Sequence, residues 1–356
     1  MGSGKTWSAA ACALTLTAAL THPAIAAGPL LPDLRQAPVG CPGGYTGDPS
    51  LCRDWDVCPV ADAKAPNGEC LTSGDMKAVR IRFTTAMDNA GDGPLLLHGR
   101  RANKNSTDMA VRQAFQTTRG AEIPATFDDA RKATAASMYY EPTPTHLHWH
   151  LMGFARMQLR TPNGRMVVAD RKNGFCLGDR YRTADADRLP GAQRDAASPE
   201  GLLAERLRKS NCGRNDPDAT EMFEGISVGQ GDDYRKGVDF QWLDLTNVTS
   251  GTYDLVNTVN SDRTLVESRY DNNSSSVSIS VQWPGGAKRR PPVIREAPAV
   301  TLLKSCPGTD RCTDQARQAG LAEHTGLAAR SGPIHEPAPA RPECGTDPSC
   351  CCCACE

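Results

Sequence analysis

Residues 241–283 read QWLDLTNVTSGTYDLVNTVNSDRTLVESRYDNNSSSVSISVQW, and this stretch decides the fold class of the chain. Over residues 277–283, valine, isoleucine and tryptophan alternate with serine and glutamine, as in a strand with one buried face. The strands predicted before it cover residues 241–246, 253–260 and 264–268. Short strands with a turn every ~8–12 residues predict a mainly β protein, an antiparallel β-sandwich with long loops.

Patterns upstream of this stretch extend the β interpretation. Residues 79–84 alternate between apolar and polar side chains, and a Pro-Asn-Gly turn at 162–164 predicts a hairpin that returns over residues 166–169. Residues 109–115 have an ambiguous pattern, and we expect a short helix there. Residues 183–220 are charged and show neither the two-residue period of a strand nor the 3.6-residue period of a helix, so they predict a long surface excursion.

Composition excludes several classes of protein. The chain has 356 residues, which is enough to bury a sizeable hydrophobic core without cross-links. Its 40 Lys and Arg residues nearly balance 41 Asp and Glu residues, and the net charge is -1. Because nucleic-acid binding depends on a basic surface, we expect no nucleic-acid partner.

The N-terminus predicts export from the cell. Residues 1–26 carry one lysine, then a run of small and apolar residues, then Ala-Ile-Ala, which is typical of a secretory signal peptide. No later segment approaches the roughly 20 apolar residues that a membrane span requires, so we expect no transmembrane segment. The mature protein is therefore expected to be secreted and extracellular, or periplasmic if the source has an outer membrane.

Cysteines divide the exported chain into groups of even number. After Cys12 leaves with the signal peptide, 14 of the 15 cysteines remain. The groups are Cys41, Cys52, Cys58 and Cys70, then Cys176 and Cys212, then Cys306 and Cys312, then Cys344, Cys350 to Cys353 and Cys355. The first group allows two local bridges with three connectivities, and we expect the first eight cysteines to be oxidised. The terminal CCCCACE is either a thiolate metal-binding tail or a disordered end.

These features divide the chain into three parts. The signal peptide covers residues 1–26, and one domain covers residues 27–283. An irregular Cys-rich lobe lies at 41–74 within that domain. A flexible Pro- and Arg-rich tail, with the terminal cysteine cluster, is expected over residues 284–356.

Three of the seven histidines lie in His146-Leu147-His148-Trp149-His150. Alternate side chains of a strand share a face, so the three imidazoles point one way, and Leu147, Trp149 and Leu151 point the other and form a hydrophobic back. Neighbouring histidines of such a strand are about 6.6 Å apart and the outer pair about 13 Å apart, so a bend is needed for all three to bind one ion.

This histidine pattern predicts a metal site. Imidazole ligands suit copper, zinc, iron or nickel, and three protein ligands with an open position are typical of a reactive site. The alternative is a polar histidine face that binds no ion.

Several blocks in register carry a resemblance to a known family. They read LLPDL from residue 30, IRFTTAMDNAGDGPLLL from 81, HLHWHLMGFA from 146, KNGFCLGDRY from 172, GISVGQGDDY from 225, FQWLDLTNV from 240 and LVESRYDNNSSSV from 265. In these blocks the chain resembles the lysyl oxidase family, in its shorter bacterial-type catalytic domain. The resemblance makes residues 27–283 the expected catalytic domain.

The resemblance implies a set of site residues and a reaction. Copper is expected on His146, His148 and His150, and a lysine tyrosylquinone is expected to form from Lys172 and Tyr234. With copper and dioxygen, such an enzyme oxidatively deaminates a primary amine or a protein lysine side chain to an aldehyde, releasing ammonia and hydrogen peroxide. Because a protonated amine cannot add to a quinone, the lysine is expected to be desolvated or near a cation.

Departures from the family pattern limit three assignments. Arg156 stands where animal members carry a histidine, so no proton-abstracting base is named. Cysteines that flank the quinone tyrosine in animal members are absent, which leaves Cys176 with Cys212 as the expected central disulfide. Some members bind calcium at positions that match Asp33, Leu34, Asn272 and Asn273, but Arg269 replaces their late aspartate, with Asp271 as a substitute ligand.

The sequence therefore favours a secreted copper-dependent amine oxidase of lysyl oxidase type. The first alternative is an exported copper-binding β-sandwich module that never forms the quinone and has no oxidase activity. A third class is an extracellular adhesion or wall-associated β-sandwich with vestigial ligands.

Overall fold

A computed structural model describes residues 1–2, 28–170, 172 and 174–313 of the chain. Residues 3–26 of the predicted signal peptide and the terminal cysteine cluster lie outside this description. Among the described residues, no helix has both the length and the apolar character needed to cross a membrane.

Seventeen strands make up most of the regular structure of the described chain. They are β1 (Leu34–Gln36), β2 (Trp55–Val60), β3 (Ala78–Phe83), β4 (Thr85–Asn89), β5 (Leu95–Arg100), β6 (Asp108–Ala114), β7 (Lys132–Glu141), β8 (His148–Leu151), β9 (Ala155–Arg160), β10 (Met166–Asp170), β11 (Tyr181–Arg182), β12 (Glu221–Ile226), β13 (Gln230–Tyr234), β14 (Trp242–Asp244), β15 (Gly251–Val259), β16 (Ser274–Gln282) and β17 (Ala299–Pro307). The helical elements are α1 (Pro199–Arg208) and the 3-10 turns η1 (Pro49–Leu51), η2 (Ala186–Arg188), η3 (Pro190–Ala192) and η4 (Pro284–Gly286).

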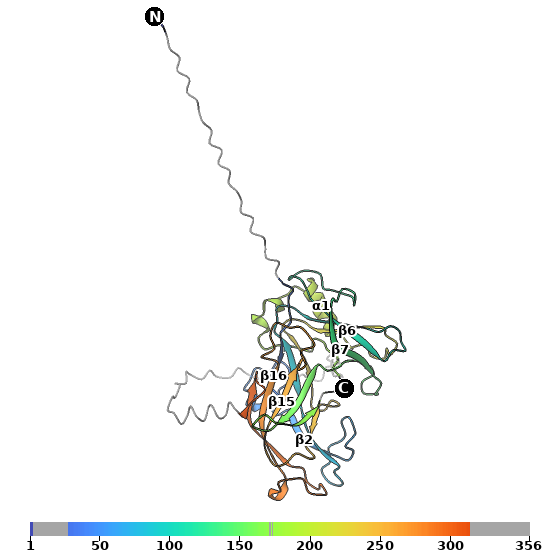
Figure 1. The fold of residues 1–356 in the computed structure, drawn as a ribbon, viewed down its shortest axis with the longest axis vertical. Helices are drawn as coiled ribbons and strands as arrows, with labels where there is room; N and C mark the ends of the chain where they lie inside the picture. Colours follow the sequence, from blue (N-terminus) through green and yellow to red (C-terminus); the bar gives the residue numbers. More distant parts are fainter. Residues whose placement is uncertain (3–27, 171, 173, 314–356) are drawn as a thin grey trace, which may run out of the picture.

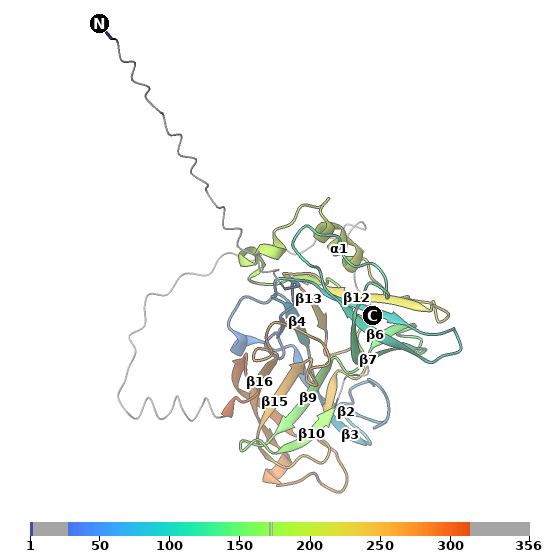
Figure 2. The same cartoon turned by 45° about the horizontal axis from the view of Figure 1, so that its top comes forward.

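The strands form antiparallel sheets, which confirms the predicted fold class. Their orders are β10-β9-β15-β16-β17, β14-β3-β2, β12-β5-β6-β7-β8 and β1-β4-β13-β11. Strands β15 and β16 lie side by side in one half of the molecule (Figure 1), and β9 and β10 lie next to them (Figure 2). Strands β6, β7 and β12 gather with α1 in the other half (Figure 2).

The first hydrophobic core fills the space between the sheet of β15 and the sheet of β3. Ile279 and Trp283 of the decisive sequence stretch pack there with Ile81 and Phe83, and all four are at most 2% exposed. The alternation of apolar residues along β16 therefore buries one face, as the sequence predicted.

A second core supports the histidine strand. Trp149 and Leu151 of β8 pack with Met138, Phe154 and Phe175, and each of these side chains is at most 2% exposed. Trp149 and Leu151 thus form the hydrophobic back that the sequence predicted, whereas Leu147 is half-buried and lies outside this cluster.

The structure corrects several local expectations. Residues 109–115 form most of β6 rather than a helix, because their long-range pairing with β5 and β7 determines the conformation. Residues 299–307, expected within a flexible tail, form β17 on the edge of the β16 sheet. The expected strand at 264–268 is irregular, and the excursion at 183–220 contains α1.

Four disulfides join the cysteines as predicted for the first eight. The local pairs are Cys41–Cys52 and Cys58–Cys70, and the later pairs are Cys176–Cys212 and Cys306–Cys312. The first two resolve the three open connectivities in favour of sequential bridges, and the expected central disulfide is confirmed.

Candidate active site

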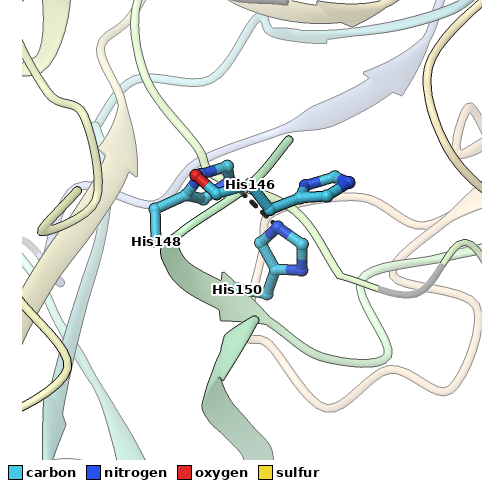
Figure 3. A group of neighbouring side chains, drawn as sticks. All are labelled: His146, His148 and His150. Atoms are coloured by element: carbon cyan, nitrogen blue, oxygen red, sulfur yellow. Dashed lines mark hydrogen bonds between the residues drawn. The ribbon is translucent and has the colours of Figure 1, made fainter. Parts of the chain in front are cut away.

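The three histidines of the sequence pattern converge on one point. Their ring centroids are 5.4, 4.9 and 4.6 Å apart, and one ligand nitrogen from each lies within 4.8 Å of the others (Figure 3). His148 and His150 lie on β8, but His146 precedes it. Leu147 between them has a φ of 52°, in the left-handed region that leucine rarely adopts. This residue provides the bend that the spacing required.

Packing behind and beside β8 fixes the histidines in place. The indole of Trp149 donates to the Asp216 carbonyl at 3.0 Å, and the Arg101 guanidinium covers its ring at 4.6 Å. On the other side, Gly174 has a φ of 98°, and a Cβ placed there would lie 2.3 Å from the His150 Cβ. Glycine is therefore required for the chain beyond Lys172 to lie against the metal-facing strand.

The nitrogen positions fit a bound ion. His148 Nδ1 lies 2.7 Å from the His146 carbonyl, which accepts its proton, and His148 Nε2 lies 2.9 Å from His150 Nε2. Two imidazole nitrogens bound at about 2.0 Å and at a right angle would be about 2.8 Å apart, so this pair has the separation of two ligands on one ion. Burial lowers the pKa of His148 to about 4, which keeps it in the neutral form that binds metals.

Asp239 joins this cluster from the segment between β13 and β14. Its Oδ2 lies 3.0 Å from His146 Nε2 and accepts a hydrogen bond from the Thr145 hydroxyl at 3.2 Å. Its backbone carbonyl accepts from the Lys172 ammonium or amine nitrogen at 3.2 Å. A single residue therefore contacts both a histidine of the cluster and the lysine of the predicted cofactor.

Lys172 lies buried between the histidines and Tyr234. It is 3% exposed, and its Nζ lies 4.9 Å from the centre of the Tyr234 ring and 5.8 Å from that of Phe175. Burial lowers the pKa of Lys172 from 10.5 to about 8, although the charges of Asp239 and Asp232 oppose this shift. The amine is thus far more often neutral at pH 7 than an ordinary lysine.

Tyr234 is the last residue of strand β13. Its hydroxyl donates to Asp232 Oδ2 at 3.0 Å, and its ring packs edge-on against Phe175 at 4.9 Å. Burial, followed by the nearby Asp232 and Glu224 charges, raises the pKa of the phenol well above 10. Burial also raises the pKa of Asp232 to about 7.

The five residues singled out by the sequence thus share one region of the structure. The histidines reach Lys172 through Asp239, and Lys172 faces the Tyr234 ring. Sequence reasoning missed Asp232 and Asp239. Asp232 could have been found, because residues two apart on a strand share a face. Asp239 could not, because 93 residues separate it from His146.

A second polar cluster lies where the resemblance implied calcium. The Asn272 amide donates to Asp33 at 2.9 Å, and the Asn273 amide donates to Glu267 at 2.7 Å. Among the described side chains, the Oδ1 atoms of Asn272 and Asn273 are buried without a hydrogen-bond partner. Burial raises the pKa of Glu267 to about 7. These unpaired oxygens and carboxylates fit a hard cation such as calcium.

Two details of this cluster differ from the sequence interpretation. Glu267 was missed, although it accepts hydrogen bonds from the Leu34 amide, Asn260 and Asn273. Asp271 was considered as a substitute ligand, but its carboxylate pairs with the Arg269 guanidinium at 3.0 Å.

Comparison with known proteins bears on the family of the chain. Residues 208–285 match the family model described as lysyl oxidase. Lysyl oxidase homolog 3 of Homo sapiens is 31% identical over 130 residues, which cover 36% of this chain and 14% of that protein. Lysyl oxidase homolog 3B of Danio rerio is 32% identical over 130 residues, 36% of this chain and 13% of the relative. Lysyl oxidase homolog 2 of Xenopus laevis is 31% identical over 129 residues, 36% of this chain and 14% of the relative.

These matches have a limited extent. The chain spans about 14% of the length of the curated relatives that it matches. The family-model match contains Tyr234, Asp232 and Asp239 but begins after the three histidines and Lys172. Within those limits, the family-model match and the named relatives agree with the sequence blocks in register, and over residues 208–285 the chain is similar to lysyl oxidases.

Proposed function

We propose that this protein is a secreted copper-dependent amine oxidase of lysyl oxidase type. Its cofactor is a lysine tyrosylquinone derived from Lys172 and Tyr234, and its substrates are peptidyl lysine or small primary amines. One observation carries the proposal: the Lys172 amine faces the Tyr234 ring at 4.9 Å beside three converging histidines. An ordinary structural lysine is seldom buried in this way without a carboxylate partner at its nitrogen.

His146, His148 and His150 would hold the copper ion. When bound, copper with dioxygen supplies the oxidising power for forming the quinone and for turning over amines. The neutral His148 imidazole is ready to bind a metal without first losing a proton. The apolar cluster that contains Trp149 supports strand β8, which carries His148 and His150.

The surroundings of Lys172 and Tyr234 prepare these two side chains to be joined. Burial of Lys172 raises the fraction of neutral amine, the form able to attack an oxidised ring. Asp232 accepts the phenol hydrogen bond and thereby fixes the rotation of the Tyr234 ring. Phe175 packs against the same ring and excludes water from one side.

We also propose that the cluster of Asp33, Glu267, Asn272 and Asn273 binds calcium. The two buried amide oxygens without partners support this assignment, because such groups cost free energy unless an ion or donor pairs with them. The cluster lies on segments far apart in sequence, so the ion would stabilise the fold rather than take part in the reaction.

Peptide mapping after incubation with copper and air tests the oxidase function. We expect a joined Lys172–Tyr234 peptide, quinone staining and peroxide release on adding a primary amine. Lys172→Arg and Tyr234→Phe should abolish all three while copper stays bound. The matched controls Lys209→Arg and Tyr45→Phe change outlying residues of the same types and should behave as wild type.

Two outcomes would count against the proposal. Copper bound by the wild type without any joined peptide would favour the exported copper-binding module. Oxidase activity that persists in Lys172→Arg or Tyr234→Phe would overturn the cofactor assignment.

A further inference from the structure

We propose that Asp239 is a positioning residue that sets the His146 tautomer and holds the Lys172 amine beside the metal site. The inference rests on the proposed copper site. Asp239 Oδ2 lies 3.0 Å from His146 Nε2, and the side chains are 15% and 10% exposed. The same residue's carbonyl accepts from Lys172 Nζ at 3.2 Å.

The hydrogen bonds give two of the histidines opposite tautomers. His146 Nε2 faces a carboxylate, which only accepts, so the proton lies on Nε2 and Nδ1 is left to bind a metal. His148 Nδ1 faces the His146 carbonyl, so the proton lies on Nδ1 and Nε2 is left to bind. A carboxylate behind a metal-binding histidine fixes the ring and raises its basicity.

The backbone around Asp239 is held on both sides. Phe240, the next residue, has a φ of 59° and donates its amide proton to the Pro66 carbonyl at 3.0 Å. Val238, the preceding residue, donates to the Arg235 carbonyl at 3.0 Å. A non-glycine residue keeps a left-handed conformation only where its surroundings enforce it. The Asp239 carbonyl is therefore aimed at Lys172 by the fold and not by local preference.

Glu141 and Asp232, two other carboxylates of this region, do not share this arrangement. The Glu141 carboxylate accepts from the Thr143 amide and hydroxyl, and the Asp232 carboxylate accepts from the Tyr234 phenol. Only Asp239, among these three, contacts both a metal-site histidine and the lysine. Loss of the Asp239 carboxylate should therefore weaken copper binding through His146, whereas the backbone carbonyl that contacts Lys172 is retained in any side-chain substitution.

The first test measures copper affinity and the copper EPR spectrum of the full chain. In Asp239→Asn, competition with a chromophoric chelator should show copper affinity about 10–100-fold below wild type, with altered hyperfine splittings. Asp239→Glu should recover part of the affinity. The matched control Asp244→Asn removes a carboxylate that accepts from the Thr246 amide and should leave affinity and spectrum unchanged.

The second test needs no substitution. Nitrogen NMR of the full chain loaded with zinc, a diamagnetic ion, should show His146 bound through Nδ1 and His148 bound through Nε2. The same tautomer at both positions would overturn the proposal, as would wild-type copper affinity and spectrum in Asp239→Asn.

Failure of this inference is distinguishable from failure of the proposed function. If the wild type binds no copper, both fail. If the wild type binds copper but yields no joined Lys172–Tyr234 peptide, the oxidase function fails, while the Asp239 assignment still stands or falls on the affinity, spectrum and tautomers.

Discussion

The most direct consequence of the buried Lys172 concerns the pH dependence of cofactor formation. Only the neutral amine can attack the oxidised ring, so the rate of joining should follow the neutral fraction. With a pKa of about 8, against the usual 10.5, about 9% of Lys172 is neutral at pH 7 instead of about 0.03%. Burial thus gives a roughly 300-fold gain in reactive amine.

The expected profile follows from these fractions. Between pH 6 and pH 8 the neutral fraction rises from about 1% to about 50%, so the initial rate should rise about 50-fold and then level off. A nearby copper ion would lower the pKa of Lys172 further, so the midpoint should lie at or below pH 8. Copper-free protein is loaded with copper in air at each pH, and the joined peptide is quantified by mass spectrometry over time.

A neighbouring charge offers an internal check on this reasoning. Asp232 raises the pKa of Lys172 by its charge, so Asp232→Asn should shift the midpoint to lower pH. A rate that stays flat from pH 6 to 9, or that keeps rising past pH 10, would refute the reasoning. The free energy of unfolding changes with pH in the same direction as the rate of joining. Between about pH 8 and 10.5 the unfolded chain binds the extra proton, so this lysine makes the free energy of unfolding rise with pH.

Three further predictions concern stability and ions. Replacing Cys176 and Cys212 by serine opens a bridge across 36 residues and should lower the free energy of unfolding in urea by about 3–4 kcal/mol; unchanged stability would contradict it. Trp149→Ala, at a fully buried position, should cost about 3–5 kcal/mol and weaken copper binding, checked by urea unfolding and chelator competition. Calcium should raise the Tm of the wild type but not of Glu267→Gln, and equal shifts would argue against the site.

Local sequence patterns predicted the strands in which apolar and polar residues alternate clearly or a turn motif marks the end. The alternation in β16 and the Asn163-Gly164 turn between β9 and β10 depend on neighbours a few residues away. Strand β6 was misread as a helix because residues 109–115 place apolar side chains at spacings that fit either period. Its pairing with β7, whose partner residues lie 19 to 31 positions later, decides between them.

Strand β17, in the predicted flexible tail, is a second strand that the sequence pattern did not reveal. Proline and arginine around residues 284–298 suggested a flexible segment, yet residues 299–307 form an edge strand on β16. An edge strand buries little of its surface, and most β17 side chains are exposed or half-buried. Composition alone therefore gave little sign of it.

Some features of the candidate site could likewise be predicted from local sequence patterns, and others depend on contacts with distant segments. Period-2 spacing identified the histidines, and the blocks in register identified Lys172 and Tyr234. Two features that complete the site are tertiary: the left-handed Leu147 and the left-handed Phe240. Each costs roughly 1–2 kcal/mol, and a leucine or phenylalanine gives no sequence signal for it.

These two strained residues directly follow the two side chains that meet across the site. Leu147 follows His146 and Phe240 follows Asp239, and the His146 Nε2 to Asp239 Oδ2 contact joins the two segments. Local preference would relax both turns, so the surrounding packing must hold them. The histidine segment alone would therefore straighten and separate its outer imidazoles. The three-histidine geometry is thus a property of the folded protein. It forms where the histidine segment contacts the connection between β13 and β14.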